Sequence, residues 1–134
     1  MQTDKLREVI RLAEKIGFAF VASADKNGAP HIAAAGKLTL ADKDSVAVEE
    51  WFCPGTIANL NMNKHVSIVV WSKEPDNGYQ LVGEVKKIND LGMLDGFSPA
   101  LESAHPLPQV KKQLLIKIDK ILEFKLAPHS DIED

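Results

Sequence analysis

Apolar residues recur every three or four positions near the start of the chain. This spacing is typical of an amphipathic helix, and Gly17 ends it; the apolar positions are Leu6, Val9, Ile10, Ala13 and Ile16. Beyond Gly17 the apolar residues alternate with others, as they do in β-strands. The pattern therefore predicts one helix followed by six strands, at residues 18–24, 30–36, 45–49, 66–71, 79–88 and 114–126.

Turn residues predict how these strands pair. Asn27-Gly28 between the first two strands favours a tight antiparallel hairpin, and Pro75 to Gly78 between the strands at 66–71 and 79–88 favours a second one. Residues 18–24 are apolar on both faces, so we expect that strand to run through the middle of the structure. The expected fold is mainly β, a small barrel or sandwich with peripheral helices.

Three irregularities interrupt the strand pattern. Gly83 lies inside a strand and predicts a bulge or the close approach of another backbone. Lys120 breaks the apolar row of the last strand and predicts a bulge or bend. Glycines and prolines interrupt residues 89–108, where we expect a loop with short helical pieces.

The corner from Glu49 to Asn63 differs most from ordinary core or surface. We expect a strand end, a bend at Pro54-Gly55 and a helix that opens at Thr56, whose hydroxyl would cap it. The first N–H groups of a helix have no partner within the helix, and a phosphate could accept from them. The alternative is a helix cap in an ordinary connection.

The strand at 30–36 contains three consecutive alanines, where strands normally carry branched or aromatic residues. Small side chains leave space beside the backbone. Either a large flat ligand lies against Ala33, Ala34 and Ala35, or the strand packs tightly against Trp51 or Trp71 in the core.

Composition narrows the class of protein. We expect residues 1–134 to form a single domain, with a net charge of −3 and no apolar run long enough to cross a bilayer. The charge argues against nucleic-acid binding, which needs a concentrated basic surface. The N-terminus lacks the order of a signal peptide, and the lone Cys53 cannot form an internal disulfide, so the expected location is the cytoplasm.

Side-chain chemistry alone names no catalyst. The four histidines are scattered and Cys53 has no second cysteine nearby, so no metal site is expected. Cys53 could pair with a distant histidine as a nucleophile, but a thiol next to Pro54 is more often a small buried side chain. Glu49 and Glu50 are neighbours in a strand and point to opposite faces, so they would not share a site as an acid–base pair.

Three segments together resemble a known family. FVASADKNGAPHIA, VAVEEWFCPGTIANLNMNKHVSIVVW and GYQLVGEVKKI are similar to segments of the FMN-binding split β-barrel proteins related to pyridoxamine 5'-phosphate oxidase. The resemblance implies a six-stranded antiparallel Greek-key barrel that forms a homodimer, with FMN at the dimer interface. It places Ala33, Ala34 and Ala35 beside the phosphate and ribityl chain, Glu49 and Glu50 near the flavin ring, and Gly55-Thr56 at the phosphate.

The sequence departs from the family pattern at the phosphate. Relatives place Lys or Arg just before the threonine, and polar or basic residues on the preceding strand, whereas this chain has Gly55 and alanines. Losing a charge-assisted hydrogen bond typically lowers affinity tenfold or more. Lys37, Lys64 or a residue of the second chain could compensate.

The resemblance implies a flavin-dependent oxidoreductase with a small-molecule redox partner, in which the cofactor does the chemistry and no side chain acts as acid or base. The chain lacks the arginine-containing C-terminal segment that holds substrate in true pyridoxamine phosphate oxidases, so that activity is not expected. The alternatives are a deazaflavin as cofactor, or a dimer that is not an enzyme and binds flavin weakly, another ligand or none.

Overall fold

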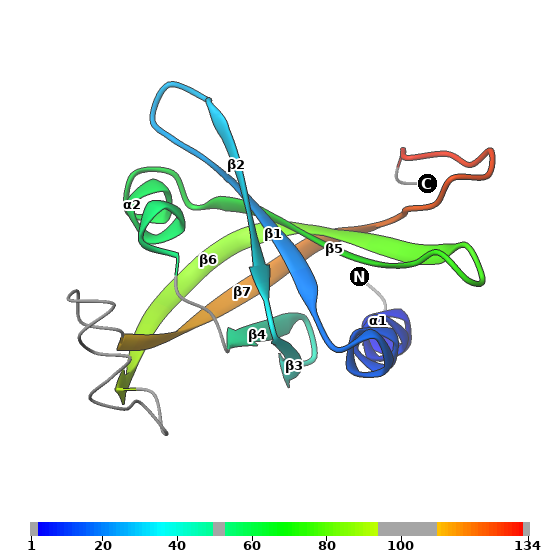
Figure 1. Ribbon diagram of the computed structural model, residues 1–134, viewed down its shortest axis with the longest axis horizontal. Helices are drawn as coiled ribbons and strands as arrows, with labels where there is room; N and C mark the ends of the chain where they lie inside the picture. Colours follow the sequence, from blue (N-terminus) through cyan, green and yellow to red (C-terminus); the bar gives the residue numbers. More distant parts are fainter. Residues whose placement is uncertain (1–2, 50–52, 94–109, 133–134) are drawn as a thin grey trace, which may run out of the picture.

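Two helices and seven strands make up the part of the chain that the structure describes (Figure 1). The computed structural model describes residues 3–49, 53–93 and 110–132, and of residues 91–93, 110 and 111 the backbone alone. The elements in chain order are α1 (Thr3–Ile16), β1 (Ala19–Ala24), β2 (Pro30–Ala35), β3 (Lys37–Asp42), β4 (Ser45–Glu49), α2 (Pro54–Met62), β5 (His65–Ser72), β6 (Asn77–Met93) and β7 (Val110–Glu123).

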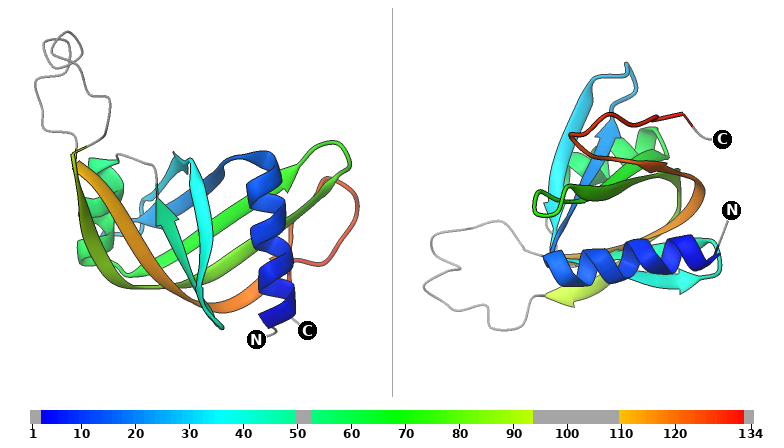
Figure 2. Two further views of the ribbon diagram at one scale, coloured as in Figure 1. Left: turned by 90° about the horizontal axis from the view of Figure 1, so that it is seen from below. Right: turned by 90° about the vertical axis from the view of Figure 1, so that its right-hand side faces the viewer.

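The strands form one antiparallel sheet in the order β2-β1-β5-β6-β7-β4-β3. β2 and β3 lie at opposite edges of this order, yet Gly36 alone separates them in the chain. The sheet must therefore curl until its two edges meet at Gly36, and Figure 2 shows the resulting strongly bent barrel. The mainly β fold with peripheral helices that the sequence predicts is confirmed.

The described residues contain one strand more than the six that the pattern predicts. The additional strand is β3, which follows Gly36 directly and pairs with β4 through Leu38 and Val48. Leu38 is 3% exposed. The run is short and bounded by a glycine and a polar turn, so its strand character depends on pairing with β4 rather than on its own sequence.

The inner and outer faces of β1 differ in exposure. β1 lies between β2 and β5 as expected, and Val21 on its inner face is buried. On its outer face Phe20 is 43% exposed and stands opposite Ala34 of β2. The expectation of a strand buried on both faces is therefore wrong for the single chain, because no element of the described chain covers the outer face of β1.

The hairpin between β1 and β2 forms as predicted, with a turn of a slightly different kind. Asp25 and Ala29 close the loop, since the Asp25 N–H donates to the Ala29 carbonyl at 3.0 Å. Gly28 has a φ of +89°, which glycine adopts without strain. The loop therefore spans three residues rather than two, and the Asp25 carboxylate supports it by accepting from the Asn27 and Ala29 N–H groups.

Gly83 marks a close approach between β6 and β7, as the sequence predicts. A Cβ atom at this position would lie 2.1 Å from the carbonyl oxygen of Lys117. The ladder shifts register here, from Val82 opposite Lys120 to Gly83 opposite Ile118, so the bulged residue is Asp119. The bulge is thus one residue before Lys120.

β6 is longer than its sequence pattern indicates. It runs to Met93 because it pairs with β7 as far as Val110, so the expected loop at 89–108 begins as a strand. Residues 94–109, where short helical pieces are expected, lie outside the described residues. β7 begins at Val110 and ends at Glu123, earlier at both ends than the predicted strand at 114–126.

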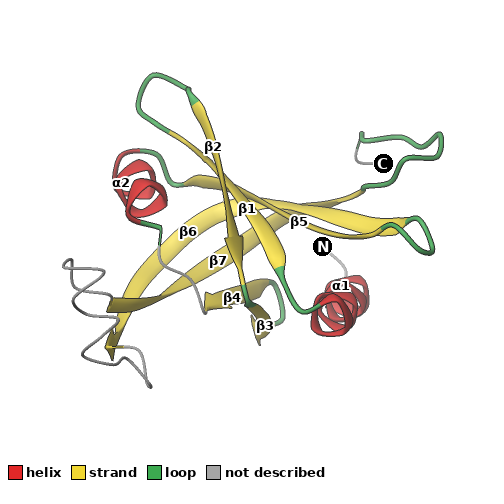
Figure 3. Cartoon of the chain, viewed as in Figure 1, coloured by secondary structure: helices red, strands yellow, loops and turns green. Residues whose placement is uncertain are grey.

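The two helices lie at opposite ends of the barrel (Figure 3). α1 packs against β3 and β5, whereas α2 packs against β1 and β2. The apolar spacing in α1 does define its buried face, and neither described helix is long and apolar enough to cross a membrane. The core fills the inside of the curved sheet; its largest fully buried side chains include Leu6, Leu60, Ile68, Leu81, Leu114, Ile116 and Ile118.

Candidate functional site

The helix at the predicted corner begins two residues earlier than expected. α2 starts at Pro54, Cys53 occupies the N-cap position, and no side chain caps the helix. Proline suits the first helical position because its missing N–H would have no partner there anyway. The prediction that the Thr56 hydroxyl caps the helix is therefore wrong: Thr56 lies inside the first turn.

Thr56 carries a buried hydroxyl without a hydrogen-bond partner. The residue is 0% exposed, and its Oγ1 bonds to no group in the described part of the chain. A buried polar group left unpaired costs about 1–3 kcal/mol. The first turn of α2 therefore holds a donor that lacks an acceptor.

A hydrogen bond from α2 to the sheet sets the position of this helix end. The Asn59 amide donates to the hydroxyl of Ser23 on β1 at 3.2 Å. Ser23 stands opposite His31 on β2, so both side chains lie on the same face of the sheet. The His31 ring in turn lies against Gly55, where a Cβ atom would be 3.6 Å from both Cε1 and Nε2. The start of α2 is thereby brought next to an imidazole.

The face of β2 below α2 carries small side chains. His31, Ala33 and Ala35 share this face because strand side chains alternate. Ala33 is half-buried and Ala35 is 3% exposed. Ala34 points to the opposite face, beside Phe20. His31 and Ala35 are separated by roughly 13 Å of extended chain.

Glu49 lies beyond the far end of this small-residue face. Its cross-strand partner is Lys37, which follows Ala35 by two residues. The Gln113 amide donates to Glu49 Oε1 at 2.8 Å and accepts from the Asn89 amide at 2.9 Å. These two bonds hold the carboxylate in one orientation. Its neighbour Glu50, predicted to approach the flavin ring, lies outside the described residues.

The structure thus brings only some of the predicted site residues together. Gly55 and Thr56 lie at the start of α2, which packs on β2, and Ala33 and Ala35 share the inner face of that strand. Glu49 lies with Lys37 on the outer face of the sheet, because its neighbour Val48 points into the core. Ala34 also points outward, beside Phe20. His31 was missed among four scattered histidines; the alternation of β2 places it on the same face as Ala33, but its contact with Gly55 depends on the packing of α2.

Of the two tryptophans offered as packing partners of the alanines, only Trp71 is described. Trp71 donates to Asp76 at 2.8 Å and packs edge-on against Phe124 with ring centroids 6.3 Å apart. Trp51 lies outside the described residues. Cys53, proposed as either a nucleophile or a buried thiol, is half-buried at the N-cap of α2. Within residues 3–49, 53–93 and 110–132, no three histidine, cysteine, aspartate or glutamate side chains gather as a metal ion requires.

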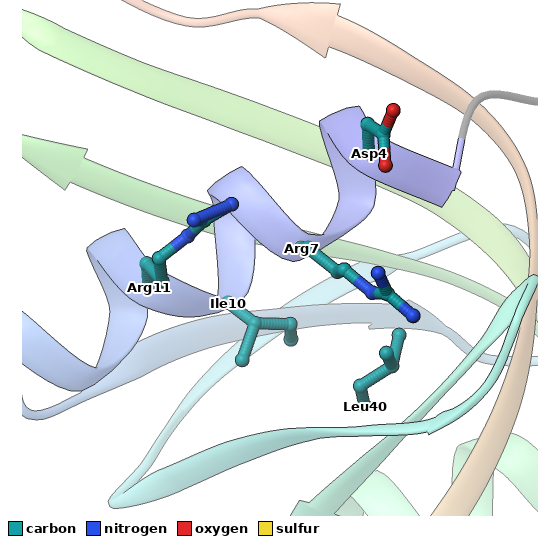
Figure 4. A pocket seen from close by; sticks show the side chains of 5 residues that line it. All are labelled: Asp4, Arg7, Ile10, Arg11 and Leu40. Carbon is teal, nitrogen blue, oxygen red and sulfur yellow. The ribbon is translucent and has the colours of Figure 1, made fainter.

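A hollow of about 410 Å³ lies between α1 and β3, away from the start of α2. Figure 4 shows Arg7 extending toward Leu40, whereas Arg11 does not. The two guanidinium groups therefore do not converge on one point, as a site for a single anion would require. The hollow is open, and Ile10 and Leu40 form its apolar lining.

The chain belongs to the pyridoxamine 5'-phosphate oxidase family, whose model matches residues 2–123. This match confirms the family that the sequence motifs resemble. A comparison with curated proteins gave no significant match.

Solved structures show the same split-barrel fold. An FMN-binding protein from Syntrophomonas wolfei has a TM-score of 0.66 and 20% identity, over 94% of this chain and 90% of that one. HutZ, the haem storage protein from Vibrio cholerae, has a TM-score of 0.55 and 12% identity, over 91% of this chain and 94% of that one. An F420 reductase has a TM-score of 0.52 and 14% identity, over 78% and 87%. At these identities the likeness establishes the fold and leaves the cofactor open.

Proposed function

We propose that this protein binds FMN with its phosphate at the start of α2 and acts as a flavin-dependent oxidoreductase. The observation that carries the proposal is the first turn of α2, where the unpaired hydroxyl of Thr56 accompanies the N–H groups of a helix end. A phosphate is the acceptor that such a helix end fits. Family membership and the likeness to the FMN-binding protein from Syntrophomonas wolfei support the proposal that this phosphate belongs to a flavin.

The family resemblance supports positions for the rest of the cofactor. It places the ribityl chain beside β2, where Ala33 is half-buried and Ala35 belongs to the core. It places Glu49, which accepts from the Gln113 amide, near the ring. When bound, FMN accepts and donates the electrons. The protein contributes binding and orientation, and no side chain is needed as an acid or base.

The outer face of β1 and β2 supports a homodimer. Phe18, Phe20 and Ile32 are 44%, 43% and 68% exposed. The two phenyl rings pack edge to face, with centroids 5.5 Å apart, and Ile32 stands opposite Ala22 on the same face. Contiguous exposed apolar side chains mark an interaction surface. A second copy of the chain is the partner we propose.

FMN is preferred over the cofactors of other relatives because of the phosphate end. The F420 reductase and HutZ, the haem storage protein, suggest a deazaflavin and haem as alternative cofactors. The deazaflavin is the second candidate, since a protein that binds it would also need an anion site. A dimer without enzymatic activity remains the candidate from another class.

Absorption spectroscopy tests the proposal. The purified protein, before and after addition of FMN and gel filtration, should retain a flavin spectrum and quench flavin fluorescence on titration. Riboflavin, which lacks the phosphate, should bind at least tenfold more weakly. A protein that retains a haem or deazaflavin spectrum and ignores FMN would contradict FMN as the cofactor. A colourless protein that ignores all three would favour the non-enzymatic dimer.

A further inference from the structure

We propose that protonated His31 is the cation that binds the ligand's phosphate at the start of α2. The inference rests on the proposed phosphate site and deepens it. Neither α2 nor β1 contains a charged residue, and His31 is the one titratable residue of β2. A phosphate bound there would otherwise meet only neutral donors. The His31 ring lies against Gly55, the residue before Thr56, and so stands beside the helix end.

Two independent features place an anion at this point. Thr56 leaves a fully buried hydroxyl without an acceptor in the first turn of a nine-residue helix. The His31 ring lies beside the same turn, where a Cβ atom added at Gly55 would be 3.6 Å from the imidazole. Histidine acts as a charged donor only when protonated, and then forms the stronger, charge-assisted type of hydrogen bond.

The other titratable groups near His31 do not provide a positive charge at the start of α2. Asp25, in the turn after β1, already accepts the Asn27 and Ala29 N–H groups. Lys26 is exposed in the same turn. On the helix side, Cys53 precedes α2 and adds no positive charge. Lys64 follows the far end of α2, where its charge acts on Glu84.

Binding measured against pH tests the role of His31. Histidines change charge between about pH 5 and 8, so wild-type affinity for FMN should exceed that of His31→Gln about tenfold at the acid end and match it at the alkaline end. His31→Arg should bind FMN tightly across the range. The phosphate has a pKa near 6 of its own, which the wild type and both variants share, so the comparison between them cancels it.

Two controls isolate the phosphate contact. Riboflavin should bind equally to the wild type, His31→Gln and His31→Arg. His65→Gln removes an exposed histidine whose neighbour is Glu84, at 3.8 Å, and should leave FMN binding unchanged. Identical pH profiles for the wild type and His31→Gln would overturn the inference while leaving the proposed FMN site intact.

A phosphate titration keeps the inference separate from FMN and from the folding of any variant. Inorganic phosphate added to the wild-type protein should shift the NMR signals of the His31 ring in a saturable manner and leave those of His129 unchanged. If FMN fails to bind but phosphate still moves the His31 signals, the proposed function is wrong and the anion site stands. If neither ligand affects His31, the inference is overturned, and the fluorescence titration with FMN decides the proposed function separately.

Discussion

Thr56 shows how one residue can fit a motif and still play another part. Its place after Pro54-Gly55 predicts an N-cap, but α2 starts earlier and the hydroxyl is enclosed without a partner. A polar group kept unpaired in the free protein is unfavourable by about 1–3 kcal/mol. Such a group is explained when a ligand supplies the missing partner.

Replacing Thr56 with valine separates stability from binding. Thr56→Val keeps the shape and removes the unpaired hydroxyl, so the free energy of unfolding of the ligand-free protein should rise by about 1 kcal/mol. FMN affinity should fall about tenfold, because the phosphate loses a donor. Chemical denaturation and fluorescence titration measure the two effects. Thr39→Val on β3 is the matched control, and an unchanged FMN affinity in Thr56→Val would exclude the hydroxyl from the phosphate site.

At the scale of elements, the Asp76 carboxylate helps to attach the C-terminal segment to the β5–β6 hairpin, together with the Phe124 N–H, which donates to the Gly78 carbonyl at 3.0 Å. Asp76 accepts from the indole of Trp71 at 2.8 Å and from the N–H groups of Leu126 and Ala127 at 2.9 and 2.7 Å. These hydrogen bonds, with that from Leu126 the largest contribution, hold the pKa of Asp76 below its usual 3.8. The segment after β7 is thus docked on its own chain.

Acidification should release this segment. Because the pKa of Asp76 is lower in the folded protein, its stabilising contribution is present above the unfolded pKa of about 3.8 and is lost as pH falls through the folded value. Asp76→Asn should remove that acid-side dependence and speed hydrogen exchange at the Leu126 and Ala127 amides at neutral pH. Asp119→Asn, at the exposed bulge of β7, is the control. Unchanged exchange at the two amides in Asp76→Asn would contradict the attachment.

At the scale of the whole molecule, the curved sheet exposes apolar side chains on part of its outer face. The barrel buries its inner face and meets edge to edge at Gly36, yet the outer face of β1 and β2 exposes Phe18, Phe20 and Ile32. A stable dimer buries about 800 Å² on each partner. The proposed interface must therefore include more of β1 and β2 than these three side chains.

Charging this face should separate the proposed dimer. Phe20→Lys and Ile32→Lys should shift the protein from dimer to monomer in sedimentation, because a buried unpaired ammonium is strongly unfavourable. Both should also lower FMN affinity if the second chain completes the site. Leu126→Lys changes an apolar residue that is more exposed than either, at 73% in the C-terminal segment, and should leave the dimer intact. A wild-type protein that sediments as a monomer would contradict the proposal.

Much of the fold follows from local sequence signals. The spacing of Leu6, Val9 and Ala13 predicts α1, and Asn27-Gly28 predicts the hairpin, because helix period and turn conformation depend on neighbouring residues. Gly83 likewise predicts the close approach that the β6–β7 pairing shows. The motifs also predict the family, which the match over residues 2–123 confirms.

Pairing between distant segments decided the rest. β3 is a strand because β4 pairs with it, and β6 continues to Met93 because Met93 pairs with Val110 of β7. The meeting of His31 with Gly55 depends on how α2 packs on β1 and β2. Local sequence carries the conformation of a turn or a helix, whereas a contact between residues 24 positions apart exists only once the sheet has closed.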